Sequence, residues 1–278
     1  MKGDCTPMVP NTVEKTMSLL GDALEARMPG WIESVYVYGS VALGAYVEHS
    51  SDIDFIAIVR GRPDSGHIRM VEEAHEELER AMPGSDIMGA YLTREQLGQP
   101  AAEIGAVPAY FEKKLHIDGK GTDLNPVTWW ILKRNGICVY GREISFAFET
   151  PTEPLIDYVI LNMNSYWLGW VNRLAARIES TDSSERDITA DRVDKAVEWC
   201  SLGMLRQLYT IRERDVTSKL GAGEFGLRVM PEHWHPLIRE AMAVKRGEPD
   251  RHYASQRDRL RELVELLRHI HLECNRGI

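Results

Sequence analysis

Residues 38–59 constrain the fold and chemistry of this chain more than any other stretch. They begin with the letters YGS, where a short β-rich run stops, and end with the apolar run DFIAIV at residues 54–59. A run that is apolar on both faces predicts a strand in the middle of a sheet. Because side chains alternate along a strand, Asp52 and Asp54 are expected to point to the same face.

These two carboxylates and the preceding Gly39-Ser40 turn predict a site for a metal and phosphates. Neighbouring carboxylates repel each other unless a cation joins them, and Mg²⁺ is commonly bound by one or two carboxylates together with phosphate oxygens. Backbone N–H groups at a glycine turn, aided by a serine hydroxyl, can bind those phosphates. A Gly-Ser turn or an Asp-x-Asp pair alone is common on protein surfaces. The prediction depends on the order and spacing of the two and on the apolar strand that follows them.

Hydrophobic periodicity divides the chain near residue 150. The first part predicts helices over residues 11–28, 68–81 and 126–136, strands over 34–38, 54–59, 87–92 and 137–140, and an irregular stretch over 98–126. The second part predicts helices only, over residues 153–179, 189–213, 233–246 and 250–273, with breaks at 179–186, 220–226 and 247–249. We therefore expect an α+β domain over residues 1–150 and an all-α domain over 151–278.

Composition narrows the class of partner. The 278 residues are 44% hydrophobic and 27% charged, with a formal net charge of −9. An acidic protein is a poor match for nucleic acid and suits a cationic or neutral small substrate. The apolar runs are far shorter than the ~20 residues that span a bilayer, so no membrane partner is expected. Four scattered cysteines and no signal peptide predict a cytoplasmic protein without structural zinc.

The first part of the chain resembles the nucleotidyltransferase superfamily, which includes DNA polymerase β and the antibiotic nucleotidyltransferases. The resemblance rests on YGSVALGAYVEHSSDIDFIAIV at residues 38–59, which matches a pattern of Gly-Ser followed by Asp-x-Asp. It implies a polymerase-β-like domain with a mixed sheet, followed here by a helical bundle.

The second part is similar to the helical domain of the streptomycin- and spectinomycin-type aminoglycoside adenylyltransferases. This similarity covers VEWCSLGMLRQLYTIRERDVTSKLGAGEFGLRVMPEHWHPLIREAM at residues 197–242, where Arg206 and Lys219 have the family's spacing of thirteen residues. The stretch LNPVTWWILKRNGICVYG at residues 124–141 resembles the actinobacterial branch. The resemblance implies that the chain transfers AMP from Mg²⁺-ATP to a hydroxyl of an aminoglycoside or related aminocyclitol.

The resemblance also implies a role for individual residues. Asp52 and Asp54 match the magnesium ligands, and a further group matches residues that position the triphosphate, namely Gly39, Ser40, Ser51, Arg206 and Lys219. Positively charged side chains suit a site where phosphate oxygens gain charge. Taken without the family, Arg206 and Lys219 are typical solvated surface residues.

The carboxylate that removes the proton from the hydroxyl is harder to assign. Alignment with the family places Ile87 or Met88 at its position, and Asp86 reaches that position only if the strand shifts by one residue. A shift of one residue turns every side chain to the opposite face, so the strand register decides whether Asp86 is catalytic. Further acids occur at Glu95, Glu103 and Glu112.

Aromatic and acidic residues of the second domain are candidates for binding a cationic acceptor. We predict Trp167, Asp194 and Glu198 for this role, although buried tryptophans and acidic helix faces are also common without any ligand. Three alternatives remain open at this point: another small-molecule hydroxyl, a protein hydroxyl, or nucleotide binding without catalysis. The chain is expected to be a monomer or a homodimer.

Overall fold

A computed structural model describes residues 8–119, 121, 123–179 and 189–276. The chain forms two compact units, a sheet unit that ends at Pro151 and a helical unit that begins at Thr152. Each unit has its own hydrophobic core.

The sheet unit is built on one six-stranded sheet with the order β5-β4-β3-β2-β1-β6. Only β2 and β3 pair in parallel, so the predicted mixed sheet is confirmed. The strands are β1 (Ile32–Val37), β2 (Ile53–Val59), β3 (Ile87–Thr93), β4 (Ala109–Phe111), β5 (Lys114–His116) and β6 (Ile137–Gly141).

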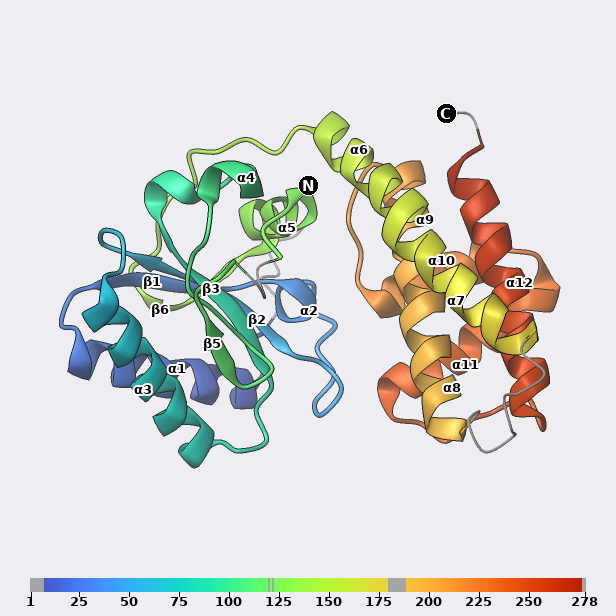
Figure 1. Cartoon of the computed structure of the whole chain (residues 1–278), viewed down its shortest axis with the longest axis horizontal. Coiled ribbons are helices and arrows are strands. Elements are labelled where there is room, and N and C mark those ends of the chain that lie inside the picture. Colours follow the sequence, from blue (N-terminus) through green and yellow to red (C-terminus); the bar gives the residue numbers. More distant parts are fainter. Residues whose placement is uncertain (1–7, 120, 122, 180–188, 277–278) are drawn as a thin grey trace. The chain divides into compact units, whose positions relative to one another are not determined.

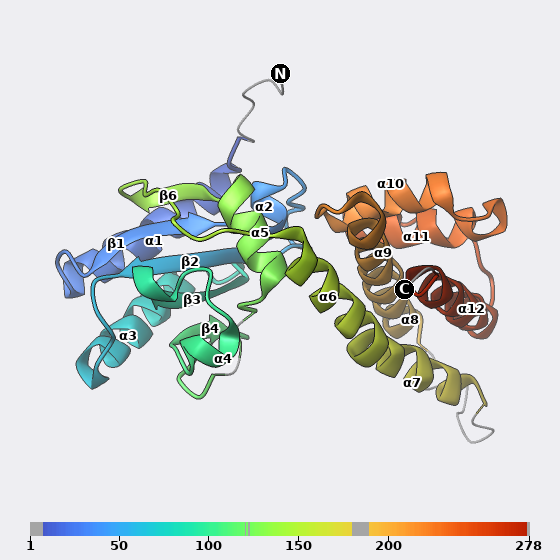
Figure 2. The ribbon, with the colours of Figure 1, turned by 90° about the horizontal axis from the view of Figure 1, so that it is seen from above.

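Helices cover both faces of this sheet. Two long helices, α1 (Asn11–Arg27) and α3 (Ser65–Ala81), lie side by side on one face, and α5 (Pro126–Asn135) lies on the other (Figures 1 and 2). The short helices are α2 (Gly39–Ala42), the 3₁₀ turn η1 (Arg94–Gln96) and α4 (Ala101–Ile104).

Alternation along the strands assigns each side chain to one of these two faces. Val37, Ile53 and Phe55 belong to the core that α1 and α3 cover. Their neighbours in sequence must point to the opposite face, the one on which α5 lies. On that face Tyr36 packs against Phe146, with ring centroids 4.9 Å apart.

The expectation of an irregular stretch over residues 98–126 is wrong. The stretch contains α4 and the hairpin of β4 and β5. Each of these strands has only three residues, too few for a periodic pattern to emerge. The hairpin turn uses Glu112 and Lys113 at φ of 48° and 58°, where the usual sequence signal is asparagine or glycine.

The helical unit contains ten helical segments among its described residues, and the strand-free second half is confirmed. They are α6 (Thr152–Asn162), η2 (Met163–Trp167), α7 (Leu168–Glu179), α8 (Ala190–Ala196), η4 (Val197–Leu202), α9 (Gly203–Glu213), α10 (Lys219–Val229), η5 (Glu232–Trp234), α11 (His235–Arg246) and α12 (Gln256–Cys274). Two of them, η2 and η4, are π-helical and interrupt long helices.

Two details of the helical prediction are wrong. The predicted break at residues 220–226 is the middle of α10, because its glycines allow close packing rather than ending the helix. A Cβ on Gly223 would lie 2.5 Å from Met242, and one on Gly226 would lie 2.8 Å from Leu205. The last helix begins at Gln256 rather than residue 250, capped by Ser255. The predicted break at 179–186 falls largely on residues 180–188, outside the described part of the chain.

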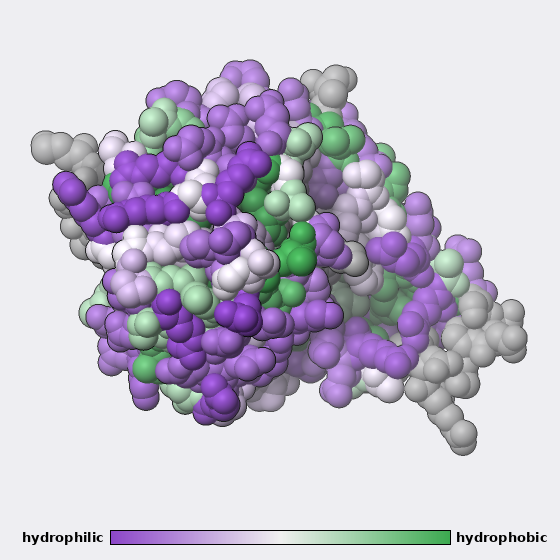
Figure 3. Space-filling model, turned by 60° about the vertical axis from the view of Figure 1, so that its left-hand side comes forward, coloured by the Kyte–Doolittle hydropathy of each residue, from purple (hydrophilic) through white to green (hydrophobic). Residues whose placement is uncertain are grey.

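The surface carries few large apolar side chains. The face drawn in Figure 3 is mainly hydrophilic, with small apolar areas between polar ones. Within the described ranges, the exposed large hydrophobic residues include Ile117, Leu161, Tyr166 and Trp199. No helix in those ranges is long and apolar enough to cross a membrane.

Candidate active site

The turn from β1 into α2 holds the carboxylate of Asp54 against the backbone of Gly39. Gly39 has a φ of +57°, and a Cβ added to it would lie 1.8 Å from Oδ2 of Asp54. The amide of Tyr38 donates a hydrogen bond of 3.0 Å to the carbonyl oxygen of Asp54. Glycine is therefore required at position 39 both for the left-handed backbone and for the approach of the carboxylate.

The two serines beside this turn differ in their surroundings. Ser40 Oγ is buried and makes no hydrogen bond to the described residues, so it is available to a ligand oxygen. Ser51 is also buried, but its Oγ accepts a hydrogen bond of 3.1 Å from the amide of Val47. That bond closes the turn that leads into β2, which gives Ser51 a structural task at the edge of the site.

Asp52 and Asp54 lie on the sheet face that α1 and α3 leave uncovered, since Ile53 between them is buried in the opposite core. The buried hydroxyl of Tyr38 reports on the charges around them. Burial raises the pKa of Tyr38 well above its usual value, and the charges of Asp54, Asp123 and Asp52 raise it further. Several negative groups therefore gather around one point of this face.

The register of β3 settles where its side chains lie. Ile53 pairs with Ile87 and Asp54 pairs with Met88, so Met88 takes the place beside Asp54. Asp86 precedes β3 and is level with Asp52, and its carbonyl accepts a 2.8 Å hydrogen bond from the amide of Ile53. Because Asp86 and Met88 are two residues apart, both point to the face of Asp52 and Asp54.

Asp86 thus faces the site without any shift of the strand, at the level of Asp52 rather than Asp54. Partial burial raises the pKa of Asp86, and the nearby charge of Asp52 raises it further. Ile87, the other position that the alignment allowed, is buried in the core.

The remaining acids of the sheet unit lie elsewhere. Glu95 and Glu103 line a cavity of about 460 Å³ with Arg62 and Thr93, and Glu112 lies in the β4–β5 turn. Among the described residues, no three His, Cys, Asp or Glu side chains come close enough to hold a metal by themselves. A cation at Asp52 and Asp54 would therefore need ligand oxygens as well, as Mg²⁺ does when it binds with phosphates.

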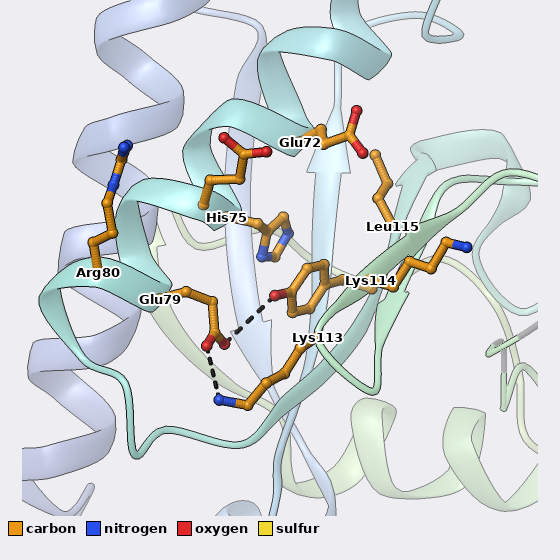
Figure 4. A pocket seen from close by; sticks show the side chains of 9 residues that line it. Glu72, His75, Glu79, Arg80, Lys113, Lys114 and Leu115 are labelled. Carbon is orange, nitrogen blue, oxygen red and sulfur yellow. Dashed lines mark hydrogen bonds and ion pairs between the residues drawn. The ribbon is translucent and has the colours of Figure 1, made fainter.

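A second cavity of the sheet unit, about 390 Å³ in volume, lies between α3 and the β4–β5 hairpin (Figure 4). His75 is buried at its base, stacked on Tyr110 at 3.7 Å and hydrogen-bonded through Nε2 to the Tyr91 hydroxyl at 2.8 Å. Burial lowers the pKa of His75 to about 3. Glu79 at the rim already pairs with Lys113 at 2.8 Å. At that pKa the histidine is neutral, and none of the residues predicted from the sequence for catalysis lines this cavity.

In the helical unit, three of the predicted residues lie in one cluster. Lys219 is the first residue of α10, and its Nζ lies 2.8 Å from Glu198 and 4.5 Å from the ring centre of Trp199. The rings of Trp199 and Trp167 are 6.1 Å apart. Trp167 is buried, and a Cβ on Gly203 would lie 2.1 Å from its ring.

The exposed aromatic residue of this cluster is Trp199, which was not among the residues predicted from the sequence. It is 40% exposed, whereas Trp167 packs in the core. Its position next to Glu198 was the available signal. The π-helical geometry of η4 turns the residues of this segment away from the usual helical spacing, so the periodic pattern concealed it.

The remaining two predicted residues lie in helices of the same unit. Arg206 lies on α9 and is half-buried. Asp194 lies on α8, where its carboxylate accepts hydrogen bonds from Arg251 and Arg259. Arg259 also pairs with the fully buried Glu240. Burial opposes ionisation of Asp194, but the hydrogen bonds and charges of the two arginines lower the pKa of its carboxyl below the ordinary value.

Comparisons with known proteins agree with the division into a sheet unit and a helical unit. Residues 19–104 match the nucleotidyltransferase domain, and residues 177–269 match the C-terminal domain of aminoglycoside adenylyltransferase. The fold is similar to that of spectinomycin adenyltransferase AAD(9) from Enterococcus faecialis, solved with ATP and spectinomycin. That match has a TM-score of 0.61 and 14% sequence identity, and covers 91% of this chain and 98% of the other. A comparison with curated protein sequences gives no match.

Proposed function

We propose that this chain, which matches the nucleotidyltransferase domain and the C-terminal domain of aminoglycoside adenylyltransferase, transfers AMP from Mg²⁺-ATP to a hydroxyl of an aminoglycoside or related aminocyclitol, releasing pyrophosphate. The spectinomycin adenyltransferase of similar fold, solved with ATP and spectinomycin, supports both the nucleotide and the class of acceptor.

The observation that carries the proposal is the contact between Gly39 and the carboxylate of Asp54. It brings an acid, a second acid at Asp52 and the buried hydroxyl of Ser40 to the start of α2. Two carboxylates on one strand face fit a hard divalent cation that takes its other ligands from phosphate and water. Bound Mg²⁺ would neutralise the triphosphate and polarise the phosphorus that is attacked.

The chain's own residues would position the reactants. Ser40 donates its free hydroxyl to a phosphate oxygen, and Ser51 holds the turn that presents Asp52. From the helical unit, the proposal assigns Arg206 and Lys219 to the phosphates of the nucleotide. Phosphoryl-type transfer depends mainly on such positioning and charge stabilisation, because the protein has little covalent chemistry to perform. The proton of the hydroxyl passes to a carboxylate on the same sheet face, for which Asp86 is one candidate.

We assign the acceptor to the cluster around Glu198 in the helical unit. A carboxylate beside the exposed ring of Trp199 suits an amine-bearing sugar, because ammonium groups bind both to carboxylates and to aromatic faces. Trp167 supports this ring from the core, and Asp194 stabilises α8, the helix that leads into Glu198. The formal net charge of −9 also favours a cationic acceptor.

The test measures Mg²⁺-dependent pyrophosphate release from ATP with spectinomycin and streptomycin as acceptors, and the mass gain of one AMP on the acceptor. Asp54→Asn and the double variant with Asp52→Asn should reduce kcat by at least about 10³-fold, since the metal site supplies much of the charge stabilisation. Glu14→Gln, an exposed acid on α1 across the sheet, is the matched control and should leave kcat unchanged. Undiminished turnover in the aspartate variants would overturn the proposal.

One observation favours a second function, nucleotide binding without catalysis. Met88 occupies the place beside Asp54, where the family has an acid. This alternative predicts ATP binding in calorimetry with no AMP transfer to aminoglycosides, to other hydroxyl compounds or to proteins. A different alternative is AMP transfer to a hydroxyl of another small molecule or of a protein, which is the same reaction with another acceptor.

A further inference from the structure

Among the residues that the structure describes, no acid of the sheet lies directly beside Asp54. The neighbouring position on β3 is Met88, whose thioether cannot take a proton from an alcohol. Asp86 faces the same side, but it is level with Asp52. The charge of Asp86 interacts with Asp52 and with Tyr46, a residue in the segment before β2. An acid that takes the proton next to Asp54 would therefore have to come from a segment packed on this face of the sheet.

The segment that leads into α5 approaches the sheet from that direction. Helix α5 lies on the face of Asp52 and Asp54 and contacts α2, the helix that begins at Gly39 (Figure 1). Its start is firmly fixed. Asn125 caps it by accepting hydrogen bonds from the amides of Val127 at 2.9 Å and Thr128 at 3.3 Å.

Asp123 lies two residues before this cap. The hydroxyl of Thr128 donates a hydrogen bond to the backbone carbonyl of Asp123, which ties the residue to the first turn of the helix. Its side chain is exposed and so accessible to a substrate. Its position is therefore set by the start of α5 and, through the contact of α5 with α2, by the turn at Gly39.

This placement agrees with the electrostatics of Tyr38, because the charges of Asp54, Asp123 and Asp52 all act on its hydroxyl. Tyr38 follows β1 directly, and its amide is bonded to the carbonyl of Asp54. Asp54 thus lies on the sheet, and Asp123 lies on the segment that leads into α5, the helix in contact with α2.

We propose that Asp123 is the catalytic carboxylate that accepts the proton of the attacking hydroxyl, an inference that rests on the proposed nucleotidyl transfer. The hydroxyl oxygen forms a bond to the α-phosphorus of ATP as its proton moves to a carboxylate oxygen of Asp123. The bond between that phosphorus and the bridging oxygen breaks, and pyrophosphate leaves with the electron pair. Asp123 then returns its proton to solvent, for which its exposure is suited.

This assignment explains why methionine is acceptable at position 88. An acid on β3 and an acid on the segment before α5 would both lie on the sheet face of Asp54. Asp123 can therefore take the role that an acid at position 88 would have. In this arrangement Asp52 and Asp54 of the sheet bind the cation, and the proton acceptor lies on the segment before α5.

The kinetic test compares three aspartate-to-asparagine variants with wild type in the AMP-transfer reaction. Asp123→Asn should lower kcat by about 10²- to 10⁴-fold, the range for loss of a general base, with ATP affinity within a few-fold. Asp86→Asn should lower kcat by less than tenfold. Asp118→Asn removes an exposed charge from the same segment, near His116, and should change neither quantity. Circular dichroism shows whether each variant folds.

A placement test does not depend on turnover. Fe²⁺ with ascorbate and ATP replaces Mg²⁺ and cleaves the backbone near the metal, and mass spectrometry locates the cuts. We expect cuts near residues 52–54 and near 121–125. Cuts near 52–54 and 86–88 only, or an Asp123→Asn enzyme with near-normal kcat, overturn the role of Asp123 and leave nucleotidyl transfer intact. No cuts at 52–54 and no AMP transfer by wild type would refute the proposed function itself, and the role of Asp123 with it.

Discussion

The two units of this chain arrange their carboxylates in opposite ways. On the sheet face of Asp52 and Asp54, acids lie beside acids, and burial and the charge of Asp52 both raise the pKa of Asp86. In the helical unit, Asp194 pairs with the cations Arg251 and Arg259, and Arg259 also pairs with the buried Glu240. A group of like charges calls for a cation from outside the protein, whereas a group of opposite charges is already complete.

The difference distinguishes a reactive site from a structural network without reference to any ligand. In the sequence, the acidic helix face that contains Asp194 and Glu198 and the pair Asp52 and Asp54 are both short acidic patterns. Only their partners separate them. Variants of the network formed by Asp194, Glu240, Arg251 and Arg259 should therefore act mainly on stability, and variants of the sheet face mainly on catalysis.

The largest effect on stability is expected from Arg259→Met. Arg259 is 1% exposed and pairs with Glu240, which is fully buried, so the variant leaves a buried carboxylate without its cation. Loss of one partner of a buried pair costs about 3–5 kcal/mol of unfolding free energy. Urea unfolding followed by tryptophan fluorescence measures the change.

Two further variants give this prediction its controls. Arg261→Met removes an exposed arginine of the same helix, paired with exposed Asp258, and should cost less than about 1 kcal/mol. Arg259→Met combined with Glu240→Leu removes both charges and should regain much of the loss. Equal destabilisation by Arg259→Met and Arg261→Met would contradict a self-compensated network.

The sheet face is tested by Gly39→Ala. The new methyl would collide with the carboxylate of Asp54 and displace it, and a shift of about 1 Å in a catalytic group can cost ~10²-fold in rate. We expect a fall in kcat of this order for AMP transfer. Gly61→Ala is a close control, because Gly61 also has a positive φ, of 85°, but has no atoms within 4 Å of an added Cβ. A similar loss in both variants would mean that backbone strain, not displacement of Asp54, is responsible.

The sequence was sufficient wherever geometry is set by neighbours along the chain. The two-residue period of a strand places Asp52 and Asp54 on one face, whereas the steric demand for glycine at position 39 comes from the carboxylate of Asp54 on a different element. The sequence was also sufficient for the general fold class, because long helical periods after residue 150 differ clearly from the short apolar runs before it.

What the sequence could not supply depends on contacts between distant segments. Asp194 meets Arg251 and Arg259, which are 57 and 65 residues away, so its role was invisible in the local acidic pattern. The place of Met88 beside Asp54 depends on how two strands align, which side-chain patterns leave open. Asp123 belongs to a segment without periodicity and was not considered for the site.

A smaller effect on stability is expected from Asp194→Asn. The pKa of Asp194 in the folded protein lies below its ordinary value, so the ionised carboxylate stabilises the fold. This stabilisation is fully present above the unfolded-state pKa and is lost as the pH falls through the folded-state pKa. At pH 7 the variant should lose about 1–3 kcal/mol, typical of a hydrogen bond to a charged group. The loss should fade in acid. Asp191→Asn, an exposed acid on the same helix, is the control. An unchanged fold with an altered KM for the acceptor would instead make Asp194 a binding residue.

The smallest effect, and the one of opposite sign, is expected from Asp86→Asn. Burial and the charge of Asp52 raise the pKa of Asp86 in the folded protein, so ionised Asp86 disfavours the fold above that pKa. The neutral amide should therefore raise the thermal midpoint slightly at pH 7. The gain should disappear as the pH falls below the unfolded-state pKa, where aspartate is neutral in both states. Mg²⁺ with ATP should also reduce the gain, because a cation at Asp52 relieves the same repulsion in wild type. A midpoint lowered at pH 7, as in Asp194→Asn, would show that the acids of the sheet face are compensated after all and remove the physical argument for a metal there.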